Sequence, residues 1–86
     1  MTKDQLTDLL VHLELTRDGD AFRPPPGFGV IVYLGVDREP LVIDHITKLE
    51  VAGPHVILTT QKKGLVEKFG APVETVRTVH VFTNGK

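Results

Sequence analysis

The side chains best able to do chemistry in this chain are its four histidines, which are the only plausible neutral ligands for a metal ion: His12, His45, His55 and His80. Neither the two-histidine helical motif nor the close pairs of a structural zinc site occurs among them. His45 and His80 would meet only if their strands were neighbours, with Asp44 adding a carboxylate. We therefore expect exposed or hydrogen-bonded histidines, and neither a metal nor a cofactor.

His45 has the most distinctive context of the four. It falls on the face of a predicted strand that also carries Leu41, Ile43 and Leu49. A neutral, hydrogen-bonded histidine in or beside the core is the expected explanation. The alternative is a functional or pH-sensitive histidine, which with Asp44 would be the centre of a metal- or His/Asp-dependent enzyme.

Catalysis has few other candidates in this sequence. The chain contains neither serine nor cysteine, so covalent acyl transfer would need threonine or lysine, and no activating arrangement surrounds either. The lack of cysteine also excludes disulfides and thiolate-bound zinc. We therefore expect a protein that is not an enzyme.

The basic residues suggest a second alternative, a small nucleic-acid-binding or transcription-regulatory domain. Its contacts would be Lys62 and Lys63 in a polar turn, joined by Arg77 if the last strand lies alongside. The formal net charge of −1, with acids and bases interspersed, provides no overall attraction to a polyanion. Solvated turn lysines are the favoured interpretation, so nucleic acid is a possible partner but not the expected one.

The proline run at residues 24–26 has the stiffness of a recognition peptide but not its spacing. Ligands of aromatic-groove domains repeat proline at a three-residue interval, and Gly27 stands where Pro24 would need its counterpart. We interpret the run as a rigid lead into the next strand, with Gly27 and Gly29 allowing Phe28 to tuck into the core.

An N-terminal amphipathic helix is predicted over residues 3–13. Thr2 and Gln5 have the spacing of a capping box. One apolar stripe follows at three- and four-residue spacing, formed by Leu6, Leu9, Leu10 and Leu13. With two acids among its apolar residues, this segment is neither a signal peptide nor a membrane span, so we expect a cytoplasmic protein with no membrane partner.

Strands are predicted over the remainder, from residue 28 to residue 83. A long strand over 41–52 is bulged or broken near Asp44 and His45, and Gly53-Pro54 is typical of a two-residue hairpin that sets Val51 opposite Val56 and Leu49 opposite Leu58. Residues 65–69 fit a helical turn or an edge strand equally well. The last strand is predicted over 75–83.

These elements form one domain of 86 residues in the α+β class. We expect the helix to be followed by a four- to five-stranded, mainly antiparallel sheet, either strongly curved or closed into a small barrel. The scarcity of asparagine and glutamine fits a protein from a warm habitat.

Two predicted strands are apolar on both faces, over residues 28–34 and parts of 76–82. One short helix covers only one side of a small sheet, so the other side must close on itself or meet another molecule. We therefore expect a small protein-interaction or assembly module that self-associates or binds another protein through an apolar sheet surface. The residues expected to form that surface are Ile31, Tyr33, Val79 and Val81.

Overall fold

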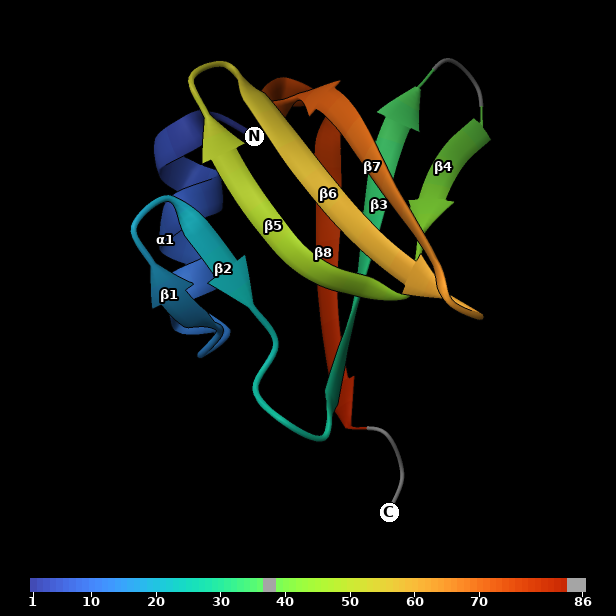
Figure 1. Cartoon of the computed structure of the whole chain (residues 1–86). Coiled ribbons are helices and arrows are strands. Elements are labelled where there is room, and N and C mark those ends of the chain that lie inside the picture. Colours follow the sequence, from blue (N-terminus) through green and yellow to red (C-terminus); the bar gives the residue numbers. More distant parts are fainter. Residues whose placement is uncertain (37–38, 84–86) are drawn as a thin grey trace.

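The computed structural model describes residues 1–36 and 39–83, which form one α-helix, eight strands and one short 3-10 helix (Figure 1). In chain order these elements are α1 Lys3–His12, β1 Thr16–Asp18, β2 Ala21–Arg23, β3 Phe28–Val36, β4 Glu39–Ile43, β5 Ile46–Ala52, β6 His55–Lys62, β7 Leu65–Pro72, η1 Val73–Thr75 and β8 Val76–Thr83.

The strands belong to two antiparallel sheets, with the order β1-β2-β5-β6-β7 in the larger and β4-β3-β8 in the smaller. The α+β class and the antiparallel pairing are confirmed. The strands are more numerous than predicted, because the Asp18-Gly19 turn closes an additional hairpin before residue 28 and the strand predicted over 41–52 divides into β4 and β5. The two sheets stay separate over the described residues, so the small barrel that the sequence left open does not form.

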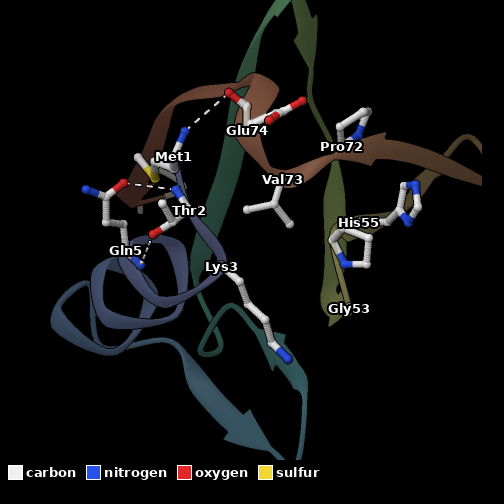
Figure 2. Close-up of a pocket in the computed structure, with 10 residues that line it drawn as sticks. Met1, Thr2, Lys3, Gln5, Gly53, His55, Pro72, Val73 and Glu74 are labelled. Atoms are coloured by element: carbon white, nitrogen blue, oxygen red, sulfur yellow. Dashed lines mark hydrogen bonds between the residues drawn. The ribbon is translucent and has the colours of Figure 1, made fainter.

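Helix α1 begins where the capping box predicts and ends one residue early. The Gln5 amide donates to the Thr2 hydroxyl over 3.1 Å, and the Thr2 amide donates to Oε1 of Gln5 over 2.9 Å (Figure 2). The Met1 amino nitrogen donates to the Glu74 carbonyl over 3.2 Å, which ties the start of the helix to η1. The helix therefore has a fixed position against the end of the smaller sheet.

The predicted long strand breaks at His45, whose φ of +57° is left-handed. The segment before the break, β4, pairs with β3, whereas the segment after it, β5, pairs with β2 and β6 in the other sheet. Alternation does not continue through a left-handed residue, so the expectation that His45 faces the core is wrong: its side chain is 49% exposed.

The hairpin between β5 and β6 has the predicted register, with Val51 opposite Val56 and Leu49 opposite Leu58. Gly53 supplies the positive φ of +59° that the first turn position requires. The segment whose type the sequence left undecided, residues 65–69, belongs to strand β7 and pairs with β6 along its whole length.

The three prolines carry the chain from β2 in the larger sheet to β3 in the smaller. The Phe28 amide donates to the Pro25 carbonyl over 3.0 Å, and Gly27 has a φ of +85°, as a type II turn requires. Phe28 is 41% exposed, so the expectation that it tucks into the core is wrong. The turn leaves Phe28 at the first position of β3, where it lines a hollow between the two sheets instead of the core.

The two sheets and the helix share one apolar core. The side chains with the lowest exposure, 0–2%, come from the helix, from both sheets and from nothing else: Leu6, Leu10, Phe22, Val30, Val32, Leu34, Leu49, Val56, Leu58 and Val76. Helix α1 lies on the same side of the molecule as the β1–β2 hairpin (Figure 1), and the Met1 amino group ties its start to η1, which precedes β8. On the opposite side, β4 and β7 form the two borders of the core.

Replacing Leu10 with alanine tests the contribution of the helix to this core. Leu10 is fully buried, so Leu10→Ala should lower the free energy of unfolding by about 2–5 kcal/mol through lost burial and a residual cavity. The neighbouring Val11 is 49% exposed, and Val11→Ala should change it by no more than about 0.5 kcal/mol. Urea unfolding of both variants measures the difference, and equal effects would contradict the assigned helix face.

Candidate interaction surface

Strands β4 and β7 are each the last strand of their sheet, and they border the same side of the molecule without pairing. In Figure 1 they diverge from the region of the Asp44–His45 bend, and β3 is visible between them. We refer to residues 41–43 of β4 and 65–69 of β7 as the open seam. No described strand connects its two borders by hydrogen bonds.

The open seam holds most of the apolar surface that the described residues leave in water. Seven large apolar side chains are exposed, and five of them are on the seam: Leu41 (49%), Val42 (47%), Leu65 (61%), Val66 (56%) and Phe69 (37%). Leu41 and Phe69 lie on the core-facing sides of their strands, whereas Val42 and Val66 lie opposite Tyr33 and Gln61 on the outer faces. Exposed apolar side chains gathered at sheet edges mark an interaction site more often than scattered single residues do.

Two of these side chains, Phe69 and Leu41, lie on the core-facing side of their sheets but at the sheet edge, where no described element covers them. Phe69 is opposite Leu58, and Leu41 is opposite Leu34. Both inner partners are buried, at 0% and 2% exposure, whereas Phe69 and Leu41 are not. The expectation that Leu41 faces inward is therefore correct for its side of the sheet but wrong for its burial. The physical reason is that no described element packs over Leu41 at the edge of the smaller sheet.

A hollow of about 200 Å³ lies inside the seam. Its lining combines the edges of both sheets with charged groups from β6 and β7: Val42, Ile43, Asp44, His45, Thr60, Lys62, Glu67 and Phe69. Opposite charges are thus present among the apolar residues of the seam, so the surface does not select for a ligand of one charge.

Asp44 and His45 form a pair at the narrow end of the seam. Nδ1 of His45 lies 3.1 Å from Oδ1 of Asp44, and both side chains are about half exposed, at 49% and 55%. The hydrogen bond from His45 lowers the pKa of Asp44 below its ordinary value, and the charges of His45 and Lys62 act in the same direction. A general acid near neutral pH needs a raised carboxyl pKa, so this shift has the opposite sign.

A second hollow, of about 450 Å³, adjoins the same bend beside the first residues of β3. It is mainly apolar, with Phe28, Ile31 and Phe82 among its lining residues and Asp44, His45 and Gln61 at its polar part. A hollow that holds a histidine and a carboxylate satisfies one requirement of a His/Asp enzyme. The exposure of the pair and the lowered pKa of Asp44 argue against that use.

A third hollow, of about 870 Å³, lies between the start of α1 and the β5–β6 turn. Its lining includes apolar groups from Pro54, Pro72 and Val73. Figure 2 shows the side chains of Lys3, His55 and Glu74 spread around this hollow rather than converging on one point. The arrangement provides no constellation for binding a specific polar group.

The four residues predicted to form one interaction surface lie on two different faces of the smaller sheet. Val79 and Val81 are opposite Val32 and Val30 on the core side, and Val79 is only 7% exposed. Ile31 and Tyr33 are on the outer face, where both are half-buried. A surface built from all four is therefore not formed, because Val79 and Val81 contribute to the core.

The outer face of the smaller sheet is partly covered by its own side chains. The Phe82 ring lies over Gly29, where an added Cβ would come within 2.5 Å of it, and the Arg77 side chain lies over Gly35 in the same way. This self-coverage explains why Ile31 and Tyr33 are less exposed than the apolar residues of the open seam.

The three basic residues predicted to contact nucleic acid are not brought together. Arg77 lies over Gly35 near the start of β8, whereas Lys62 ends β6 and Lys63 follows it in the β6–β7 turn. In Figure 1 the start of β8 and the end of β6 lie apart from each other. A fourth basic residue, Lys48 on β5, contacts Glu50 at 3.1 Å. The described residues thus present no shared basic patch built from these side chains.

Within residues 1–36 and 39–83, no group of three or more metal-ligating side chains is positioned to hold an ion. In the same part of the chain, no helix has both the length and the apolar character needed to cross a membrane. Comparison with protein-family models, curated proteins and solved structures finds no match to this chain.

Sequence reasoning missed the apolar residues of the open seam as a group. The segment Leu65-Val66-Glu67-Lys68-Phe69 shows neither clean alternation nor helical spacing, so its edge position left no periodic signal. The feature that does indicate a strand at residues 65–69 is the polar turn at residues 61–64. This turn follows a strongly β-forming segment and favours a hairpin.

Removing the His45 imidazole should raise the pKa of Asp44 toward the ordinary value. The strongest cause of the lowered pKa is the hydrogen bond from His45, and His45→Gln weakens it. Carboxyl ¹³C NMR titration of Asp44 measures the change in pKa. A depressed carboxyl pKa stabilises the fold above the unfolded pKa and loses that effect as the pH falls through the folded one. The variant should therefore lose less stability on acidification than the wild type. His55→Gln is the control, and an unchanged Asp44 titration in His45→Gln would contradict the assigned contact.

Proposed function

We propose that this chain is a small interaction module that self-associates through the apolar side chains of its open seam. The observation that carries the proposal is that five of the seven exposed large apolar side chains among the described residues line two unpaired sheet edges on one side of the molecule. Burying these side chains against a second molecule would remove apolar area from water, which is the main driving force of protein association.

The unpaired edges support the same proposal independently of the apolar area. An edge strand presents backbone N–H and C=O groups that another strand can satisfy, and proteins commonly protect such edges with charges, prolines or short length. Strand β7 has eight residues, and its six residues from Leu65 to Gly70 are all exposed. Its only proline is at the last position, Pro72, so most of the edge is free to pair.

The alternative functions have weaker support. A nucleic-acid-binding role would use Lys62, Lys63 and Arg77, which lie apart rather than along one path for a phosphate backbone. A His/Asp-dependent enzyme would use His45 and Asp44, whose exposure and pKa direction are unfavourable for acid–base catalysis.

The test is the molar mass in solution, measured by light scattering on a sizing column over a hundredfold range of protein concentration. The wild type should rise above the monomer mass with increasing concentration. Phe69→Lys should lower or abolish the rise, because it places a charge at the centre of the β7 edge. Val11→Lys is the matched control, since Val11 is 49% exposed but lies on α1, and it should associate like the wild type.

Circular dichroism and thermal unfolding establish whether Phe69→Lys stays folded. Should it unfold, Val66→Lys takes its place, because the Val66 side chain is 56% exposed and faces away from the core. A wild-type protein that remains a monomer at every concentration would overturn self-association. Equal association of the β7 variants and the wild type would overturn the assignment to the open seam.

A further inference from the structure

Resting on the proposed function, we infer that the occupant of the β7 edge is β7 of a second copy of this chain. The two strands run antiparallel about a two-fold axis, with Phe69 opposite Phe69 of the second copy. The juxtaposition that carries this inference is an exposed edge strand that, paired with its own copy in this register, sets Phe69 opposite Phe69 and its two charged residues opposite glycine and alanine.

Two-fold symmetry restricts the possible registers severely. In an antiparallel pair related by a two-fold axis normal to the sheet, one central residue is opposite its own copy, and every other pair is placed symmetrically around it. Both five-stranded sheets then join into one continuous sheet whose core-facing sides lie on the same side. Each candidate register of β7 is therefore defined by its central residue.

Charge excludes two of the central positions. Centring the pair on Glu67 would set two carboxylates opposite each other, and centring it on Lys68 would do the same with two ammonium groups. Like charges directly opposite in a sheet are destabilising. Centring on Val66 would use the turn residues Lys63 and Gly64, both with positive φ, and would leave only a short ladder.

The register centred on Phe69 avoids these conflicts. It sets Lys68 opposite Gly70 and Glu67 opposite Ala71 of the second copy, so no charged side chain meets a like charge directly. The pairing extends from Val66 to Pro72. Gly70 carries no side chain, which leaves room for the Lys68 stem to lie across the strand of the second copy.

The same register gives the exposed phenylalanine a partner. Phe69 is on the core-facing side of β7, opposite the buried Leu58, and is 37% exposed. Aromatic residues opposite each other on neighbouring strands contribute to pairing beyond their area. The two rings would extend each apolar core across the edge at which it now ends.

The charges of Glu67 and Lys68 are compatible with a second copy as the occupant. Their charges cancel within β7, so the edge attracts neither an acidic nor a basic segment preferentially. An identical strand, whose positions 70 and 71 are glycine and alanine, accommodates both long side chains without a clash.

The register can be tested by single-cysteine cross-linking, because the chain contains no cysteine of its own. Directly opposite residues have Cβ atoms about 4.5–5.5 Å apart, close to disulfide range, whereas diagonal neighbours are about 7–8 Å apart. Under mild oxidation, Phe69→Cys should shift from the monomer to the dimer mass on a non-reducing gel. Val11→Cys, on the exposed side of α1, measures the background from random collision.

A second pair of variants tests the register while keeping Phe69. Lys68→Cys alone and Gly70→Cys alone should stay at background, whereas an equimolar mixture of the two should give the dimer mass. A Cβ at Gly70 meets its nearest atom, Cδ1 of Ile57, at 3.6 Å, an ordinary contact, so Gly70→Cys should fold.

The outcomes separate the two proposals. Cross-linking in the mixture but in neither single variant supports the register. A protein that associates in light scattering but gives no specific cross-link in any of these samples would overturn the register and leave self-association standing. A protein that stays monomeric in light scattering and cross-links only at the Val11→Cys background would overturn both.

Discussion

The burial of Leu6 and Leu10 against both sheets is the interaction on which the rest of this structure depends. The two sheets enclose one core but do not pair into a closed cylinder, so each of the two gaps between them has to be covered or left in water. One helix of ten residues covers one gap. The exposed apolar side chains at the other gap follow from the lack of a second covering element among the described residues.

Most of the fold was predictable because its signals are local. The capping box, the leucine stripe and the Gly53-Pro54 hairpin each depend on residues within a few positions, and the structure has each of them. The break at Asp44 and His45 was also visible as a fault in the alternation. What the local pattern did not provide was the direction of the chain after the break, which places β4 and β5 in different sheets.

The candidate site was less predictable, since its position depends on which strand lies at an edge. Val79 and Val81 belong to a strand that is apolar on both faces, so the sequence does not show which face is buried. They pack inward because they lie opposite the buried Val32 and Val30 of β3. Phe69 has the signal of a core residue, yet no described strand lies beyond β7. Exposure at such positions is a property of tertiary arrangement, and neither periodicity nor composition contains it.

The two ends of the larger sheet differ in a way that bears on solubility. Strand β1 has only three residues, Thr16 to Asp18, and two of them are charged, which makes it a poor template for amyloid-like growth. Strand β7 is long and apolar, and it is the edge at risk. If β7 pairs with a second copy as proposed, the larger sheet is left with β1 at each outer end, so growth of this sheet would stop at a finite pair.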